Sequence, residues 1–288
     1  MKIGLNTYSF RNELKSGALS LSQVLEICSK MGTIEGIELF DGHLRASDGP
    51  DLRSQVQVAK EEIEGLGLEL FALGPHIRFR RKGKRRAKKE PSEFKRWIDA
   101  AADNDIPNLR VQGGGPIGLF GMGPPEQGIQ EYEKILPHVL PYAEERGIKL
   151  GLETHGKYSS EPDFLRLYAD KWGDSPHIAI IFDWGNFASN DELYRALDVA
   201  KEPKLHAHNH VKMYEFDPET GMETGYGAYK IVETFRKEGF SDYFSIEYAG
   251  SEDAVVGVFK SAEVLKYCIS EKKNPIDLET DPLSFLPT

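Results

Sequence analysis

Four acidic or imidazole side chains stand at the ends of successive apolar segments in the second half of the chain. Residues 149–153 end in Glu153, residues 178–183 end in Asp183, residues 205–211 carry alternating histidines, and residues 243–247 end in Glu247. Because the carboxyl ends of parallel strands meet at one rim of an α/β fold, we expect these side chains to lie together there. A single acidic strand end often only caps the next helix, but four such ends together favour a metal site. Three carboxylates and one imidazole form a mostly oxygen donor set, which suits Mn²⁺, the ion we expect, as well as Mg²⁺ or Co²⁺, and can take Zn²⁺.

The seventh apolar segment offers more than one imidazole. His206, His208 and His210 alternate, so in a strand all three would face inward, with His206 lowest and packed inside the barrel. His208 and His210 both remain candidates for the ligand or for a group behind it, and His208 is also a candidate substrate contact. His155 and Lys212 lie two residues beyond Glu153 and His210 and would face a substrate, where either could polarise a carbonyl or stabilise an enediolate.

Other side chains near strand ends are candidates for a carbohydrate pocket. Trp184 could stack on the C–H face of a sugar, although a ring in this position can also serve packing. Glu38, in the second apolar segment, could hydrogen-bond a substrate hydroxyl. His43 and His76 follow the second and third segments and either line the pocket or lie in ordinary loops.

The elements that must position these residues repeat one strand–helix unit. Short apolar runs alternate with stretches whose apolar residues recur at helical spacing. Strands are expected at 3–8, 34–40, 68–73, 108–112, 149–153, 178–183, 205–211 and 243–248, and helices at 21–31, 52–66, 91–102, 126–146, 161–172, 190–201, 228–237 and 254–269. Pro137 and Pro141 must kink or divide the helix at 126–146. Eight such units predict parallel strands and a (β/α)8 TIM barrel.

Length and composition fit a single barrel. The chain has 288 residues, 40 % of them hydrophobic, and such barrels typically take about 250 residues. We expect one domain over residues 1–271 and an extended tail over 272–288. The apolar side chains of the tail would pack on the outside of the barrel or on a second subunit, so a homo-oligomer is one option.

Charge and cysteine content bear on compartment and partners. No apolar run approaches the ~20 residues of a membrane span, and no signal peptide is visible at the first residues. Two lone thiols, Cys28 and Cys268, suit a reducing compartment, so we expect a cytoplasmic protein without a membrane partner. The net charge of −10 disfavours a protein-wide attraction to nucleic acid.

One segment breaks the acidic trend. Residues 78–89 are a dense run of lysine and arginine. Runs of this kind are typically solvent-facing. Because this one follows the third strand at the expected active rim, it could also be an anion-binding lid or a contact with an acidic neighbour.

Four short motifs carry a resemblance to a known family. They are Leu150–His155 (LGLETH), Phe182–Asn186 (FDWGN), His208–Lys212 (HNHVK) and Ser245–Tyr248 (SIEY). Together they resemble the signature strands of the sugar phosphate isomerase/epimerase superfamily, the xylose isomerase-like TIM barrel group, and the resemblance extends from residue 2 to about residue 269. It implies that one divalent cation is bound by a Glu, Asp, His and Glu set, which here is Glu153, Asp183, His210 and Glu247.

The same resemblance bears on two of the open questions. His210 precedes Val-Lys, as the ligand does in the family motif, which favours His210 over His208 as the ligand. The Asp that usually ends this motif is Met213 here. In the family, the two glutamates often also move protons.

The resemblance implies two competing enzyme classes acting on a small-molecule carbohydrate. The first is a metal-dependent isomerase or epimerase, in which Glu153 and Glu247 move a proton beside a carbonyl through an enediolate while His155 hydrogen-bonds the oxyanion. The second is a lyase at the same site: a keto-cyclitol or dehydroshikimate-type dehydratase, or a C-glycoside deglycosidase subunit. The endonuclease IV branch of the same group is expected to have a three-zinc site and an Asp-x-His motif after the seventh strand. Residues 213–218 lack that motif, so we do not expect a nuclease.

Overall fold

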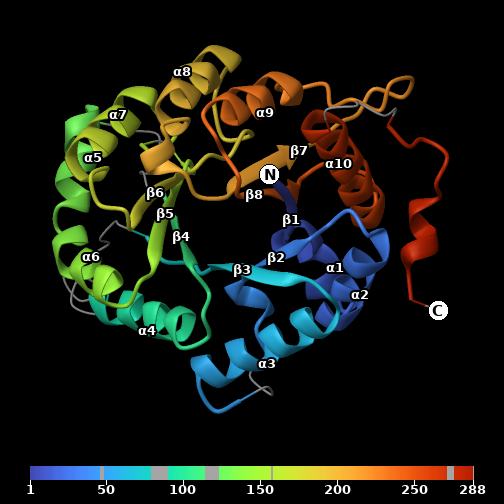
Figure 1. Ribbon diagram of the computed structural model, residues 1–288, viewed down its shortest axis with the longest axis horizontal. Helices are drawn as coiled ribbons and strands as arrows, with labels where there is room; N and C mark the ends of the chain where they lie inside the picture. Colours follow the sequence, from blue (N-terminus) through green and yellow to red (C-terminus); the bar gives the residue numbers. More distant parts are fainter. Residues whose placement is uncertain (46–48, 79–89, 114–122, 157, 271–275, 288) are drawn as a thin grey trace.

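Eight parallel strands form a nearly closed barrel, and the helices surround it (Figure 1). The computed structural model describes residues 1–45, 49–78, 90–113, 123–156, 158–270 and 276–287. The strands are β1 (Lys2–Asn6), β2 (Gly36–Phe40), β3 (Glu69–Gly74), β4 (Asn108–Gln112), β5 (Lys149–Glu153), β6 (Ile178–Ile181), β7 (Asn209–Met213) and β8 (Tyr243–Tyr248). This arrangement confirms the predicted TIM barrel.

The α-helices follow the strands in sequence, as expected for right-handed crossovers. They are α1 (Arg11–Ser16), α2 (Leu21–Met31), α3 (Leu52–Gly65), α4 (Glu90–Ala102), α5 (Pro125–Tyr132), α6 (Leu136–Glu145), α7 (Pro162–Trp172), α8 (Asn190–Ala200), α9 (Ala228–Lys237) and α10 (Ala254–Ile269). The predicted helix at 126–146 is divided into α5 and α6, with Pro137 in the first turn of α6 and Pro141 inside it. Pro137 is tolerated there because the first N–H groups of a helix have no intrahelical partner.

The barrel closes between β6 and β7 without a regular ladder. Isolated bridges join Ile180 to His206 and Asp183 to His210, and the His210 N–H donates to the Phe182 carbonyl at 3.0 Å. Strand β6 therefore ends two residues earlier than predicted, and β7 begins four residues later. The bridge between Asp183 and His210 brings these two predicted ligands side by side at the seam.

A register shift marks the pairing of β2 with β3. Ile37 pairs with Leu70, but Glu38 pairs with Ala72, so Phe71 is the additional residue on β3. Phe71 stacks on Tyr243 inside the barrel, with ring centroids 4.0 Å apart. The shift therefore supplies a large ring that fills the lower interior of the barrel, below Glu38.

The tail packs on the outside of the barrel. A short 3₁₀ helix, η5 (Pro282–Phe285), lies beside α10 (Figure 1), and the Phe285 ring lies 5.8 Å from that of Phe259 on α10. Leu278 and Leu283 stay about half exposed. In the single chain, the described part of the tail therefore packs on the barrel surface through Phe285, and Leu278 and Leu283 remain available for other contacts.

Nearly all of the basic segment 78–89 lies outside the described residues; of its cations, Arg78 is described, and its Nε donates to Gln112 Oε1 at 2.5 Å. None of the helices in the described part of the chain is both long and apolar enough to cross a membrane.

Candidate metal centre

The four predicted ligands meet at the carboxyl rim of the barrel. One ligand atom from each of Glu153, Asp183, His210 and Glu247 lies within 4.8 Å of the other three. Glu153, Asp183 and His210 are fully buried, and Glu247 is 5 % exposed. Their strands are neighbours in the second half of the barrel, so the end of each strand delivers one side chain to the same small volume.

His210 lies between carboxylates on both sides of its ring. Its Nδ1 is 3.0 Å from Glu153 Oε1 and 3.5 Å from Glu247 Oε2, and its Nε2 is 2.8 Å from Glu38 Oε2. Burial acts to lower the pKa of His210, but the charges of Glu38 and Glu153 and their hydrogen bonds outweigh it and hold that pKa well above its usual range. The ring is thus held by charge-assisted hydrogen bonds at both nitrogens.

A lysine bridges two other members of the set. Lys212 Nζ lies 3.2 Å from Asp183 Oδ2 and 2.6 Å from Glu247 Oε1. Asp183 also accepts hydrogen bonds from Gly185 N at 2.9 Å and Asn186 Nδ2 at 2.6 Å. Burial raises the pKa of Asp183 to about 6, against the opposing charge of Lys212. The lysine offsets part of the negative charge that three neighbouring carboxylates concentrate here.

Glu153 has its own cationic partner. Arg110 Nη2 donates to Glu153 Oε2 at 2.6 Å, and Arg110 itself is 6 % exposed. Burial acts to raise the pKa of Glu153, but Arg110 and His210 outweigh it and hold that pKa well below its usual range. His155 Nδ1 lies 3.7 Å from the same Oε2 atom, and the His155 side chain is 39 % exposed. Glu153 is therefore ionised, and His155 stands between it and solvent.

This donor set fits a divalent cation. Carboxylate oxygens and imidazole nitrogens bind such ions at about 2.0–2.6 Å, so two ligands of one ion lie at most about 5 Å apart. The observed limit of 4.8 Å agrees with that geometry. With Glu38 included, four carboxylates lie against two cations, Arg110 and Lys212, so with a neutral His210 the group keeps two excess negative charges, which a divalent ion would neutralise.

A cavity of about 260 Å³ opens beside the ligands. Its lining includes Glu247, Lys212, His155, Arg110 and His76. His76 is held by Asp41, whose Oδ1 lies 2.8 Å from His76 Nδ1. Of the residues predicted to bind substrate, Lys212 and His76 therefore line the cavity, as does the predicted catalytic group His155.

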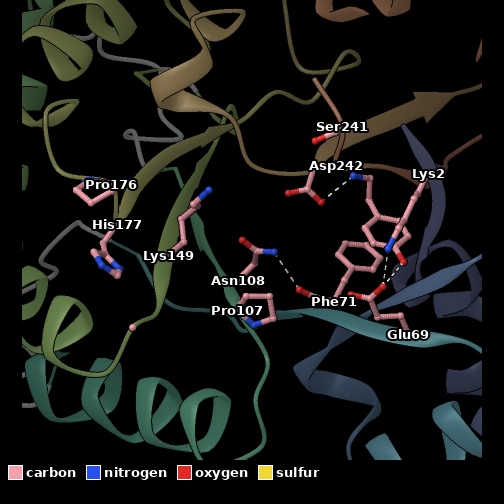
Figure 2. A pocket seen from close by; sticks show the side chains of 12 residues that line it. Lys2, Glu69, Phe71, Pro107, Asn108, Lys149, Pro176, His177, Ser241 and Asp242 are labelled. Carbon is pink, nitrogen blue, oxygen red and sulfur yellow. Dashed lines mark hydrogen bonds and ion pairs between the residues drawn. The ribbon is translucent and has the colours of Figure 1, made fainter. Parts of the chain in front are cut away.

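A larger cavity lies at the opposite end of the barrel, away from this chemistry. It measures about 360 Å³ and is lined by residues at the amino ends of strands, among them Lys2, Glu69, Asn108 and Lys149 (Figure 2). Lys2 and Glu69 pair with each other there at 2.8 Å. In TIM barrels this face typically serves stability, so the smaller cavity at the carboxyl rim is the candidate substrate site.

Three residues predicted to bind substrate lie away from this cavity. Trp184 is fully buried and meets the Phe244 ring edge-on at 5.9 Å. Neighbours along a strand face opposite sides, so a ring next to the inward Asp183 turns toward the helices. Glu38 and His208 are also fully buried and lie below His210 in the barrel. Their positions offer no surface for a substrate contact.

His206 differs from its expected position. Its ring contacts Phe235 of α9 and Phe240, and its Nε2 lies 2.8 Å from the Lys201 carbonyl, so it faces the helices and not the barrel interior. The physical reason is that residues 206–208 precede β7, so strict alternation does not apply to them. Ala207 packs instead with Ala179 and Ile181 inside the barrel.

Sequence reasoning missed two residues of the site. Arg110 holds Glu153, and Asn186 bonds to Asp183 and lies 3.5 Å from His155 Nδ1. The signal for Arg110 was present, because a cation in the middle of the buried segment Asn-Leu-Arg-Val-Gln needs an acidic partner. Asn186 follows Asp183 in a turn, and its contacts depend on where that turn lies.

Fold and site together define a (β/α)8 barrel with a candidate metal site at its carboxyl rim. The chain belongs to the xylose isomerase-like TIM barrel family, whose model matches residues 25–268. The family resemblance inferred from the four motifs is thereby confirmed. No curated protein matches the sequence at a significant level.

Solved structures with the same fold share little sequence with this chain. The probable 3-DHS dehydratase AsbF of Bacillus anthracis, involved in petrobactin synthesis, is 16 % identical, with a TM-score of 0.69 over 92 % of this chain and 99 % of that one. The 3-keto-D-glucoside 4-epimerase YcjR of E. coli is 17 % identical, with a TM-score of 0.64 over 93 % and 98 %. The IOLI protein with a binding zinc atom is 15 % identical, with a TM-score of 0.68 over 93 % and 96 %. At these identities the likeness concerns the fold alone.

Proposed function

We propose that the chain is a divalent-metal-dependent enzyme that isomerises or epimerises a keto-sugar or a related polyol. The observation that carries the proposal is that Glu247 belongs both to the buried ligand group and to the lining of the 260 Å³ cavity. A small molecule in that cavity would therefore touch the ligand group directly. The epimerase among the proteins of the same fold is in keeping with this reaction class.

The ion would be held by Glu153, Asp183, His210 and Glu247. A divalent cation supplies Lewis acidity, which makes a C–H bond next to a bound carbonyl more acidic. The oxygen-rich donor set supports Mn²⁺ as the first choice. The zinc in the IOLI protein keeps Zn²⁺ among the ions to be tested.

The protein side chains would move the proton. Glu247 lines the cavity and would remove a proton from the substrate carbon. Glu153 is fully buried, so the proton it returns would pass through His155, which lies 3.7 Å away and also lines the cavity. Lys212 and Arg110 lie in the same lining, and their positive charges would stabilise the enediolate oxygens.

A lyase remains the alternative, because its reaction begins with the same proton abstraction. In a keto-cyclitol or dehydroshikimate-type dehydratase, the intermediate would then expel a hydroxyl group. In a C-glycoside deglycosidase subunit, the C–C bond between the sugar and the group attached to it would break, and that group would leave. The first reaction differs from isomerisation by loss of water and the second by cleavage of the substrate.

Solvent deuterium exchange tests the proposal. The Mn²⁺-loaded protein would be incubated in D₂O with keto-sugars, keto-cyclitols and oxidised glycosides, and the products followed by NMR and mass spectrometry. We expect deuterium at the carbon next to the carbonyl, with loss of water or cleavage appearing only if the enzyme is a lyase. Glu247→Gln and Glu153→Gln at saturating Mn²⁺ should each slow exchange by about 10²–10⁴-fold.

Glu263→Gln is the matched control. Glu263 is a buried carboxylate on α10 that pairs with Lys266 on the same helix, remote from the cavity. This variant should exchange deuterium like the parent. If both Glu153→Gln and Glu247→Gln also exchange like the parent, the proton-pair mechanism is wrong.

The expected substrate is a small carbohydrate, and the expected compartment is the cytoplasm. Cys28 and Cys268 are both buried thiols, which supports a reducing environment. Whether the protein forms a homo-oligomer stays open to measurement by light scattering.

A further inference from the structure

Glu38 lies where no substrate can reach it. It is fully buried in the barrel, although its sequence position near a strand end suggested a substrate contact. Its Oε2 atom lies 2.8 Å from His210 Nε2 and accepts a hydrogen bond from Ser245 Oγ at 3.0 Å. The same oxygen is 3.4 Å from His208 Nε2. Three side chains from β8 and the β7 region thus converge on one carboxylate oxygen.

The position of Glu38 is fixed by its place in strand β2, between two neighbouring strands. It pairs with Asn6 of β1 on one side and with Ala72 of β3 on the other, at the register shift between β2 and β3. The additional residue of this shift is Phe71 on β3, so β2 itself keeps a regular alternation at Glu38. Below it, the His208 ring rests edge-on against Phe71, with centroids 5.3 Å apart. Glu38 is therefore held between β1 and β3, with His208 and Phe71 packed below it.

The two nitrogens of His210 face different carboxylates. Nε2 faces Glu38, whereas Nδ1 faces Glu153 and Glu247, which belong to the ligand group. A histidine ligand needs one nitrogen free of a proton for the metal, and a hydrogen bond from the other nitrogen fixes both the tautomer and the ring orientation. A carboxylate at Nε2 keeps the proton there and leaves Nδ1 for the ion.

We propose that Glu38 is a positioning residue that orients His210, so that Nδ1 is the atom presented to the divalent cation, with Ser245 and His208 holding the carboxylate in place. The proposal rests on the metal site of the proposed function. It assigns to Glu38 and His208 a role behind the site, distinct from the substrate contact that the sequence suggested. It adds a residue on β2 behind a ligand group that comes from the β5 to β8 region.

A double-mutant cycle measured by Mn²⁺ affinity tests this role without any turnover. The variants are Glu38→Leu, Glu38→Gln, His210→Ala and the combination of Glu38→Leu with His210→Ala, with Mn²⁺ binding followed by electron paramagnetic resonance and calorimetry. Loss of a group that orients a ligand typically costs about 10–100-fold in metal affinity. We expect that loss for Glu38→Leu and a smaller loss for Glu38→Gln, whose amide oxygen can still accept the bond from Nε2.

The cycle separates positioning from general damage to the barrel. If Glu38 acts through His210, Glu38→Leu should cost less than about threefold once His210 is already alanine, because interacting residues are not additive. Glu263→Gln, the buried carboxylate on α10, should bind Mn²⁺ like the parent. The visible spectrum of Co²⁺-loaded protein should change for Glu38→Leu and stay unchanged for Glu263→Gln, since it reports ligand geometry.

Each outcome decides a different statement. If Glu38→Leu lowers Mn²⁺ affinity equally with and without His210, or if neither Glu38 variant lowers it, the positioning role is wrong while the metal site stands. Should Glu38→Leu fail to fold, Glu38→Gln with the Co²⁺ spectrum gives the same decision. A parent chain that binds none of Mn²⁺, Mg²⁺, Co²⁺ and Zn²⁺ would overturn the proposed metal site, and this inference with it.

Discussion

At the residue scale, the candidate site is an arrangement of opposed charges inside the barrel. Three carboxylates and an imidazole lie within 4.8 Å of one another, and the charges of Arg110 and Lys212 lie against them. Burying carboxylates without partners would cost several kcal/mol each. Arg110 pairs with Glu153, and Lys212 with Asp183 and Glu247, so the opposite charges offset part of this cost.

Removal of one ligand should lower the affinity for the metal ion. We expect the parent to bind one Mn²⁺ per chain, and Asp183→Ala or His210→Ala to weaken binding by more than the ~10–100-fold typical of residues behind a metal site. Equilibrium dialysis with metal analysis measures both quantities. Unchanged affinity in both variants would show that the site has been misplaced.

A second residue-scale prediction concerns His43, away from the ligands. The Thr7 hydroxyl accepts from the Phe40 N–H at 3.0 Å and lies 2.9 Å from His43 Nδ1, so its proton is available to that nitrogen. Burial lowers the pKa of His43 to about 4, against the opposing charge of Asp41. An unfolded histidine has a pKa near 6.5. Between pH 6.5 and 4 the unfolded chain therefore binds a proton that the folded chain does not bind. The free energy of unfolding decreases as the pH is lowered through that window.

His43→Gln should remove this contribution. Between pH 7 and pH 4.5 we expect the free energy of unfolding to fall by about 1–2 kcal/mol less in the variant than in the parent. This is less than the full pKa difference would give, because water reaches part of the ring. Urea unfolding at the two pH values measures it. The exposed His138 on α6 is the control site, and His138→Gln should behave like the parent. Parallel pH profiles for the parent and His43→Gln would contradict the argument.

At the element scale, glycines in the first two strands make room for the ring pair inside the barrel. A Cβ on Gly36 of β2 would lie 2.8 Å from the Tyr243 ring, and one on Gly4 of β1 would lie 2.7 Å from Phe71. The stacked rings therefore lie directly against strand backbone. The larger rings of β3 and β8 fit because β1 and β2 carry no side chain at these positions.

Gly36→Ala should overpack this layer. We expect a loss of about 1–3 kcal/mol in the free energy of unfolding, because extra volume in a packed core forces neighbours to move. Gly65→Ala is the matched control, since among the described atoms nothing lies within 4 Å of its added Cβ, and alanine at the end of helix α3 should cost nothing or stabilise by up to about 1 kcal/mol. Denaturant unfolding of both variants checks the difference in sign. Equal stability of Gly36→Ala and the parent would mean that the ring pair moves without cost.

At the scale of the whole molecule, the net charge bears on whether the protein binds nucleic acid. The net charge is −10 even with the basic segment 78–89 included. Binding to DNA draws mainly on phosphate contacts and on the release of counterions. A net charge of −10 disfavours the protein-wide attraction on which such binding draws.

We therefore predict no binding to duplex DNA at about 0.15 M salt, where exposed charges more than about 8 Å apart are largely screened. A fluorescence anisotropy titration with a short labelled duplex measures this. The variant in which the arginines of segment 78–89 become serine should give the same flat titration. Salt-dependent binding that disappears in this variant would show that the segment is a nucleic-acid contact.

The local pattern of the sequence was sufficient to predict the barrel and a group of acidic and imidazole side chains at its carboxyl rim. Strand and helix periods are properties of short segments, and parallel strands bring their carboxyl ends to one rim whatever the details. Glu153, Asp183 and Glu247 could therefore be placed near one another, and near a histidine of the seventh segment, from their positions at strand ends. The choice of His210 over His208 came from the family motif. The proline-divided helix at 126–146 followed from the same local chemistry, because proline removes a backbone donor.

Only the tertiary structure decided what each side chain faces. Glu38 faces inward but lies two residues before the end of β2, so it lies behind His210 and not at the rim. The irregular backbone at 206–208 breaks the alternation on which the sequence argument relied, so His206 faces the helices. Arg110 became part of the site through contact with Glu153, a residue 43 positions away in the chain. Such contacts arise when the strands close into a barrel, and the order of residues along one strand carries no record of which side chain lies opposite in another.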